Sequence, residues 1–345
     1  MSQYQFKEVS LEDIADYLNS HAQGSFAQSP AMAEVRKDSE RDVHFVAVYE
    51  DEKIVAACQL SIINGRFKSA DITAGPLLNF TNTNLLEYFT TQIKDYCKKQ
   101  QCVYLTINPN IEYSETVLTN LKQLGWEYSG RLNTSAVGLR GGIRWMYVKV
   151  LASQTVENYQ DAYVKRHRRY IRNADPDVSI RQLDRDELNI FFKIMQHTAE
   201  RRHFASRSDA YFYSLYDRFG EQATFLIAEL KQGGEKIPFA GIVFIESNNE
   251  TVSYLGGAIS EYAKYRGSYL LHDAMIKRSI EKGYKQYNFY GIEGDITNPQ
   301  SEGYGIYEFK TKFGTGRAVE LIGEFVLPIL KTKFKLFQFI RKILK

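Results

Sequence analysis

Two parts of the chain show the same succession of hydrophobic and polar positions. Residues 43–63 and 224–245 each contain an apolar run, a polar turn that includes a Lys-Ile pair, and a second apolar run. This pattern is typical of a β-hairpin. In each part, a segment with helical spacing of apolar residues comes next, at 85–100 and at 270–283. A short apolar run follows it, at 102–109 and at 284–292. A hairpin, a helix and a strand are therefore predicted twice; a chance likeness of two hairpins is the alternative.

Helical patterns also precede each hairpin. Ser10 is the expected cap of the first helix, Asp184 or Asp186 caps a later one, and Gly220 ends the helix after that. Two helices, a hairpin with further strands, a helix and a strand form the layout of GNAT-type acyltransferases. We therefore expect a mixed α/β (α+β) fold of two fused GNAT-like domains, with mixed sheets flanked by helices. The expected domains are 1–149 plus roughly 320–345, and 150–319, with a boundary near 140–151.

Composition excludes several classes of protein. With 345 residues, 44% of them hydrophobic and 25% charged, the chain is expected to be globular rather than disordered. It contains no apolar run of about 18 residues and no basic, then apolar, leader at its start, so neither a membrane-spanning helix nor a secretory signal is expected. Cys58, Cys97 and Cys102 lack CxxC spacing, which favours buried, reduced thiols in the cytoplasm.

Basic residues gather in one internal segment although the net charge is only +3. The segment 163–174 holds five basic side chains, and within this run no acidic residue lies four positions from any of them. On a helix, most of them share one face that could neutralise phosphates, and the interleaved tyrosines could stack on unpaired bases. A solvated helix face is the alternative. The predicted nucleic-acid contacts are Lys165, Arg166, Arg168, Arg169 and Arg172.

The pattern of residues at the end of the sequence predicts a basic amphipathic helix. Its apolar stripe is Leu330, Phe334, Phe337, Ile340 and Leu344. The basic residues off this stripe include Lys331, Lys335, Arg341 and Lys342. Such a helix is typical of binding to an anionic membrane surface. A helix that docks on its own domain is the alternative, and both hold if the helix docks with one edge exposed.

Several common catalytic motifs are missing. The Gly-rich R/Q-x-x-G-x-G/A turn that binds the acetyl-CoA pyrophosphate is absent where each half would carry it, and Arg266-Gly267 is only a fragment. No GxSxG motif, no P-loop and no His spacing typical of a metal site occur. Neither a cofactor nor a metal is therefore expected.

Several segments together resemble the Fem (FemXAB) family of peptidoglycan aminoacyltransferases. The clearest is 287–330, with an aromatic strand that ends in Gly, an FK..FG element, and an acidic-Gly strand that leads into Leu-Pro. Segments 163–183, 200–212 and 252–260 are similar to the family's basic helix, its helix-loop-helix and its tyrosine-ended strand. Many members carry a long helical arm for which 172–224 leaves no room, so the chain resembles the short members without a coiled-coil arm.

The resemblance implies transfer of an amino acid from aminoacyl-tRNA to the third-residue side-chain amine of a peptidoglycan precursor. That acceptor is either UDP-MurNAc-pentapeptide or lipid II. The expected enzyme is a cytoplasmic monomer, peripheral on an anionic membrane, with the muropeptide on the first domain and aminoacyl-tRNA on the second. A CoA-dependent GNAT N-acyltransferase and a non-catalytic module that binds tRNA or membrane are the alternatives.

The resemblance also implies roles for residues of the second half. Lys310 matches the catalytic lysine that stabilises the oxyanion, and Phe309 matches an aromatic that stacks on the terminal adenosine of tRNA. From the residues alone, this pair reads as ordinary strand alternation. Arg207 matches the arginine that binds the diphosphate of the muropeptide, with pairing to Asp209 as the alternative.

Further muropeptide contacts are implied on both halves. Tyr211 and Tyr254 match tyrosines of the cleft, with half-buried core positions as the alternative. Arg36 aligns with a basic residue on the opposite side, where Lys37 could substitute for it. Asn108 stands where some members have Asp, so base catalysis is not expected there and the amine loses its proton to water or substrate.

Overall fold

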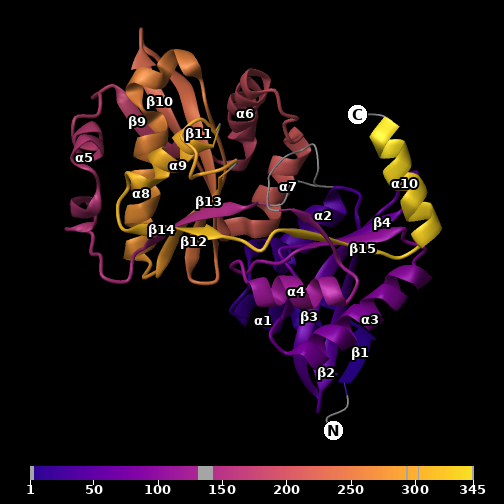
Figure 1. Ribbon diagram of the computed structural model, residues 1–345. Coiled ribbons are helices and arrows are strands. Elements are labelled where there is room, and N and C mark those ends of the chain that lie inside the picture. The colour runs from indigo at the N-terminus through magenta and orange to yellow at the C-terminus, as the bar shows by residue number, and fades with distance from the viewer. Residues whose placement is uncertain (1–3, 131–142, 293, 302, 344–345) are drawn as a thin grey trace. The chain divides into compact units, whose positions relative to one another are not determined.

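The computed structural model describes residues 4–130, 143–292, 294–301 and 303–343. The chain divides into two compact units (Figure 1). The first unit comprises the residues up to Trp145 and those from Glu320 onward, and the second comprises Met146–Val319. Residues 140–142 of the predicted boundary lie outside the described residues.

The first unit is an eight-stranded mixed sheet with helices. The sheet order is β1-β2-β3-β4-β6-β15-β7, and β5 pairs with β3. Its strands are β1 (Tyr4–Glu8), β2 (Asp42–Glu50), β3 (Lys53–Ile63), β4 (Ser69–Thr73), β5 (Leu77–Leu78), β6 (Tyr104–Asn108), β7 (Glu127–Gly130) and β15 (Glu324–Pro328). Its helices are α1 (Leu11–Ser20), η1 (Phe26–Gln28), α2 (Pro30–Asp38), α3 (Thr83–Lys99), α4 (Glu115–Gln123) and α10 (Lys331–Ile343).

The second unit is a seven-stranded mixed sheet with helices, in the order β14-β8-β13-β12-β11-β10-β9. Its strands are β8 (Trp145–Val150), β9 (Val178–Gln182), β10 (Ala223–Gln232), β11 (Glu235–Ser247), β12 (Glu250–Ala258), β13 (Gln286–Ile292) and β14 (Gly316–Glu320). Its α-helices are α5 (Lys165–Arg172), α6 (Leu188–Arg202), α7 (Asp209–Phe219), α8 (Gly267–Glu281) and α9 (Tyr304–Thr311). Its 3₁₀ helices are η2 (Tyr159–Ala162), η3 (Arg185–Glu187), η4 (Gly220–Gln222) and η5 (Ser260–Tyr265).

The predicted repeat is confirmed by the strand pairing. In the first unit, the hairpin β2-β3 is antiparallel, β4 adds to β3, and β6 follows α3 and pairs parallel to β4. In the second unit, β10-β11, β12, α8 and β13 repeat the same steps with the same strand directions. The expected fold class, two GNAT-like units with mixed sheets flanked by helices, is therefore confirmed.

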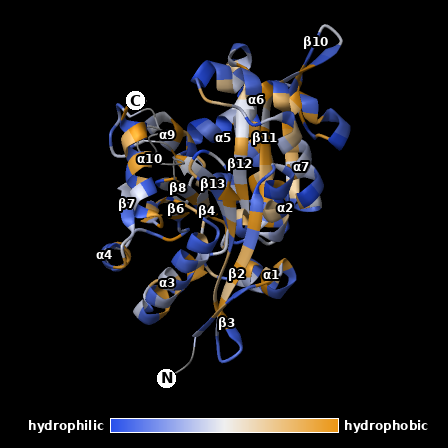
Figure 2. Cartoon of the chain, turned by 90° about the vertical axis from the view of Figure 1, so that its right-hand side faces the viewer, coloured by the Kyte–Doolittle hydropathy of each residue, from blue (hydrophilic) through white to orange (hydrophobic). Residues whose placement is uncertain are grey.

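The predicted helix ends follow local chemistry. Ser10 caps α1 and exchanges hydrogen bonds with Asp13 in a capping box. Asp184 forms the same arrangement ahead of α6, and α7 ends at Gly220, whose φ is 52°. The helices show both hydrophobic and hydrophilic colours in Figure 2, as amphipathic helices that cover a sheet do.

Two further expectations concern the described residues. Cys58, Cys97 and Cys102 are free and buried, as expected. Among the described residues, no helix combines the length and the apolar character that crossing a membrane would require.

Candidate active site

Lys310 is a buried cation held by main-chain carbonyl groups. Its side chain leaves the last turn of α9, and only 6% of the residue is exposed. Its Nζ donates to the carbonyl oxygens of Gly291, at 2.6 Å, and Tyr290, at 3.1 Å, near the end of β13. Burial lowers the pKa of Lys310 to about 7, so the charged and neutral forms are close in free energy at neutral pH.

The FK..FG element is helical where it contains this lysine. The alternative reading of Phe309 and Lys310 as strand alternation is therefore wrong, because both lie on α9. Phe309 lies on α9 and Phe313 lies two residues beyond its end; their ring centroids are 5.4 Å apart, and both rings pack on His272. This long-range packing overrides the local alternation of the sequence.

The backbone is strained where it holds Lys310. Tyr290 has a φ of 60°, which is uncommon for a bulky residue. The side-chain oxygen of Asn288 accepts a 2.8 Å hydrogen bond from the Tyr290 N–H and supports this conformation. Such strain is found preferentially at functional sites.

A cavity opens in the second unit where two parallel strands separate. β12 and β13 pair only through Glu250–Val252 and Gln286–Asn288. Beyond these pairs, Ser253 and Gly256–Ala258 on one strand, and Phe289 and Gly291 on the other, line a cavity of about 600 Å³. That volume suits a small ligand or the end of a larger one. Lys310 and Phe309 line the same cavity.

Small residues and two arginines shape this cavity. A Cβ on Gly257 would lie 2.4 Å from Thr198 Oγ1, and a Cβ on Gly256 would lie 2.9 Å from an Ile242 carbon. Only glycine therefore fits at these positions without displacement of neighbours. Arg201 and Arg202 also line the cavity. They were not singled out from the sequence, although both lie in the 200–212 segment.

Phe309 belongs to an aromatic cluster that reaches α5. Its ring meets Tyr269 edge-on at 4.9 Å, and His167 of α5 lies 6.4 Å away. Burial lowers the pKa of His167 to about 4, helped by nearby cations, and burial together with Lys310 lowers that of His272 to about 3. Both imidazoles are therefore neutral at physiological pH, and the Tyr287 hydroxyl forms a 2.6 Å hydrogen bond with His272 Nδ1.

The predicted basic stripe lies on α5 and faces solvent. Lys165, Arg166, Arg169 and Arg172 are exposed, while His167 is the buried residue of the helix. Arg168 differs from them because it donates to Asp161, seven residues before it, at 2.9 Å. The guanidinium of Arg266, which precedes α8, lies 3.3 Å from the ring centre of Tyr170 on α5. Arg266 is therefore a further cation beside the exposed cations of α5, and it was not predicted from the sequence.

Arg207, Tyr211 and Tyr254 form a chain of contacts that leads to Lys310. The Arg207 guanidinium lies 5.1 Å from the Tyr211 ring centre, and the hydroxyls of Tyr211 and Tyr254 share a 2.7 Å hydrogen bond. Tyr254 packs edge-on against Tyr290, whose carbonyl accepts from Lys310. Ser208 positions Tyr211 by capping α7. Residues predicted separately are therefore brought together within one unit.

Arg36 and Asn108 belong to the first unit. Arg36 is buried in the last turn of α2, whereas Lys37 is exposed and pairs with Glu34 at 2.8 Å. Asn108 ends β6, and its Oδ1 accepts a 2.9 Å hydrogen bond from the Ala74 N–H. Among the described residues, no group of three or more His, Cys, Asp or Glu side chains could hold a metal ion.

Two tandem units with this strand and helix order define a protein of the GNAT-like fold class. A tandem GNAT protein from the clavulanic acid biosynthesis pathway shares the fold, with a TM-score of 0.57, 9% identity, and coverage of 95% of this chain and 99% of that one. The chain belongs to the FemAB family, whose model matches residues 9–232 and 230–342. The predicted family is thereby confirmed.

Curated relatives cover nearly the whole chain. Aminoacyltransferase FemB of Staphylococcus epidermidis is 24% identical over 413 aligned positions, which cover 98% of each chain. Aminoacyltransferase FemA of the same species is 23% identical, with 99% of this chain and 100% of the relative covered. The crystal structure of a FemX has a TM-score of 0.82 at 19% identity and covers 96% of this chain and 99% of that one. The protein is therefore an enzyme of the aminoacyltransferase class, as expected.

Proposed function

We propose that the protein transfers an amino acid from aminoacyl-tRNA to the third-residue side-chain amine of a peptidoglycan precursor and so builds its peptide branch or bridge. Membership of the FemAB family supports the reaction class. The observation that carries the assignment is the set of contacts around Lys310, which lines the cavity together with Phe309. The Phe309 ring lies near His167 of the basic helix α5, and the Lys310 ammonium donates to Tyr290, which packs on Tyr254 of the Arg207–Tyr211–Tyr254 contacts.

The reaction is the aminolysis of an ester, for which Lys310 is suited. The amine nitrogen attacks the ester carbonyl carbon, the carbonyl oxygen becomes an oxyanion, and the bond to the ribose oxygen then breaks. An ammonium group has three N–H donors, and two are used by the carbonyls of Tyr290 and Gly291. The third remains for the oxyanion, where a preorganised donor contributes about 3–4 kcal/mol.

The proton of the attacking amine leaves without a side-chain base in this proposal. Asn108 cannot accept a proton, and its Oδ1 is occupied by the Ala74 N–H. The amine therefore loses its proton to water or to the leaving ribose oxygen of the substrate.

The aminoacyl-tRNA is assigned to the second unit. Phe309 is half-buried and lines the cavity beside Lys310, and the exposed part of its ring is assigned to stacking on the terminal adenosine. Lys165, Arg166, Arg169 and Arg172 are exposed to contact phosphates, and Arg168 adds to them if Asp161 releases it. No CoA is required in this reaction.

The muropeptide is assigned to Arg207, Tyr211 and Tyr254 of the second unit, while Arg36 and Asn108 of the first unit stay contacts that the family resemblance predicts. Arg207 is exposed, and its planar guanidinium suits the diphosphate that links the sugar to uridine or to lipid. We take lipid II as the physiological acceptor, because the basic helix α10 would bring a monomeric, cytoplasmic enzyme to the membrane surface where lipid II lies.

A transfer assay tests this function. The protein is incubated with radiolabelled alanyl-, seryl- or glycyl-tRNA and with UDP-MurNAc-pentapeptide or lipid II, in parallel with acetyl-CoA and the same acceptors. Transfer from a charged tRNA that is lost in Lys310→Met and retained in Lys277→Met, an exposed lysine of α8, supports the proposal. Transfer from acetyl-CoA alone, or from no donor, contradicts it.

A further inference from the structure

The helix α10 docks on the first unit through only part of the predicted apolar stripe. Phe334 is buried and packs with Val103 and Val326. Phe337 stacks on Tyr104 with ring centroids 4.9 Å apart. Leu344 lies outside the described residues. The docked side of α10 is thus used for folding, which confirms the docking alternative for this stripe.

A second apolar stripe on α10 faces solvent. Leu336, Phe339 and Ile343 are 51%, 61% and 66% exposed. Their spacing of three and four residues places them in one row along the helix. They are three of the six large hydrophobic side chains that are exposed in the described part of the chain. A row of adjacent exposed apolar residues on one element is typical of a surface that binds a partner.

Lysines flank the exposed stripe on both sides. At 100° per residue, Lys331, Lys335 and Lys342 lie about a quarter turn to one side, and Lys333 lies about a quarter turn to the other. All four are exposed, and no acidic residue occurs from 331 to 345. Arg341 lies seven residues from Phe334 and therefore on the docked side of the helix. In the basic flank, Lys333 thus takes the place of Arg341, which was expected there from the sequence.

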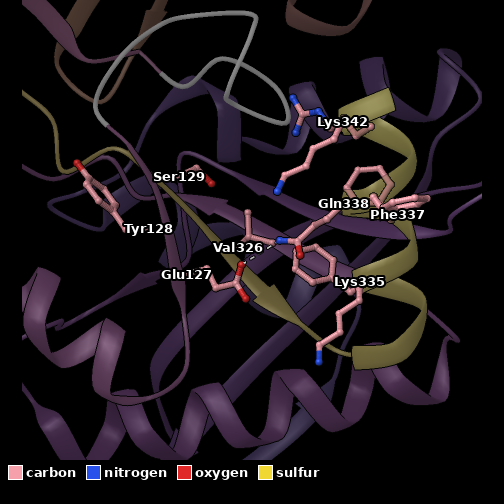
Figure 3. Close-up of a pocket in the computed structure, with 11 residues that line it drawn as sticks. Glu127, Tyr128, Ser129, Val326, Lys335, Phe337, Gln338 and Lys342 are labelled. Atoms are coloured by element: carbon pink, nitrogen blue, oxygen red, sulfur yellow. Dashed lines mark hydrogen bonds between the residues drawn. The ribbon is translucent and has the colours of Figure 1, made fainter. Parts of the chain in front are cut away.

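The flank that holds Lys335 and Lys342 opens onto a groove. α10, β7 and β15 line this groove, which has a volume of about 600 Å³ and an apolar floor that includes Val326 and Phe337. Figure 3 shows Lys335 and Lys342 at the groove, on either side of Gln338, which donates a 3.4 Å hydrogen bond to Glu127. The ammonium groups are therefore free to approach phosphates from this side.

We infer that α10 is an interfacial membrane anchor, whose row of Leu336, Phe339 and Ile343 inserts into an anionic bilayer while the flanking lysines contact lipid phosphates. Charge complementarity favours an anionic bilayer as the partner, because the flanking lysines are positive and lipid phosphates are negative. The long lysine stems let the ammonium groups reach the headgroup level while the apolar face of the helix lies among acyl chains. A second copy of the chain fits less well, since pairing along this row would bring lysines of like charge together. The inference rests on the proposed function in one respect: membrane binding would give the enzyme access to a lipid-linked acceptor.

Vesicle binding of the full chain tests the anchor without any substrate. The probes are vesicles of phosphatidylcholine with and without phosphatidylglycerol, and the measurement is co-sedimentation at low and high salt. The wild type should bind the anionic vesicles at least ten-fold more tightly than the neutral ones, and salt should weaken the binding. The triple variant Leu336→Ser, Phe339→Ser and Ile343→Ser should bind at least ten-fold more weakly with an unchanged melting temperature.

Matched variants separate the two faces of the helix. Val150→Ser, at an exposed hydrophobic position of the second unit, should bind as the wild type does. Phe337→Ser should lower the melting temperature because it removes a docking contact. Wild-type binding by the triple variant, or a wild type that ignores anionic vesicles and dimerises through this row, overturns the inference. Failure of the proposed function appears differently, as absence of transfer to either acceptor while vesicle binding is unaffected.

Discussion

The same pair of parallel strands is closed in one unit and open in the other. β4 and β6 pair over all five residues, from Ser69–Tyr104 to Thr73–Asn108, whereas β12 and β13 pair over only three. In the first unit, the Asn108 side chain continues the contact beyond the last pair by accepting from the Ala74 N–H. In the second unit, the strands separate around a cavity that contains Lys310.

This difference shows how a duplicated fold can divide its tasks. A sheet gains stability when its strands remain hydrogen-bonded, and the first unit also buries Asp71, which accepts a 2.6 Å hydrogen bond from Thr106. In the second unit, fewer residues of these strands are paired, and a cavity lies where they separate. The backbone of Tyr290, whose carbonyl accepts from Lys310, is strained there. We therefore expect substitutions at the open pair to impair catalysis and those at the closed pair to affect mainly stability.

The largest effect is expected for Lys310→Met, which removes the cation from the open strand pair. The turnover number kcat should fall by about 10²-fold or more, because one preorganised oxyanion donor is lost. KM for the muropeptide should change little. Steady-state kinetics with Lys277→Met as the control provide the measurement. Equal turnover by the variant and the wild type would assign the chemistry to another group.

The same lysine should make stability depend on pH. Its folded-state pKa of about 7 lies below the ordinary 10.5, so between these values the unfolded chain binds one more proton than the folded chain. Stability then rises with pH in this window, and the cost of burying the ammonium is fully present below pH 7.

Urea unfolding at several pH values measures this effect. The free energy of unfolding of wild type minus that of Lys310→Met should increase by about 2–3 kcal/mol between pH 7 and pH 9, since each pKa unit corresponds to about 1.4 kcal/mol. Lys149, whose pKa burial lowers to about 8, is common to both proteins and cancels in the difference. A difference that is constant with pH would mean that Lys310 stays charged in the folded protein.

Arg207→Ala should act on the acceptor rather than on the chemical step. The expected change is a rise of about ten-fold or more in KM for the muropeptide, because a charge-assisted hydrogen bond contributes about 1.5–3 kcal/mol. Arg185→Ala is a matched control, since Arg185 also lies over a tyrosine ring, that of Tyr213, in the same unit. A change confined to KM for the charged tRNA would place Arg207 in the donor site instead.

The smallest effect on catalysis is expected at the closed pair. Asn108→Ala should reduce the free energy of unfolding by about 1 kcal/mol, because the Ala74 N–H loses its acceptor. Its kcat should remain within about three-fold of the wild type, and any change in catalysis should be a rise in KM for the muropeptide, to which the family resemblance assigns Asn108. Asn108→Asp should not raise kcat if the proton leaves to water or substrate. A large fall in kcat for both variants, at an unchanged melting temperature, would show that the first unit takes part in the chemistry.

Regular patterns made much of the fold predictable from sequence. The hairpins, α3, α8 and the strands after them follow from local periodicity, and the caps at Ser10 and Gly220 follow from single residues. The α9 helix was not predictable in this way, because Tyr307, Phe309 and Phe313 alternate like a strand. Packing of Phe309 and Phe313 on His272, which is distant in sequence, decides its structure.

The candidate site was predictable only in part for a similar reason. The family resemblance pointed to Lys310, Arg207, Tyr211 and Tyr254 individually. Their connection through Tyr290 depends on a positive φ at one strand residue, which no side-chain pattern announces. Likewise, the exposed row on α10 could not be told from the docked one, because Phe337 and Phe339 are equally apolar in sequence.

The hydrogen bonds from Lys310 to main-chain oxygens bear on how the amino acid that this enzyme transfers could change during evolution. Substitutions of cavity side chains alter the size and polarity of the space, but the carbonyls of Tyr290 and Gly291 are present whatever those side chains are. Under the proposed function, donor selectivity and catalytic power therefore depend on different parts of the chain. Directed evolution at Thr198, Ile242 or Ser253 could therefore retune donor preference while the ammonium stays in place.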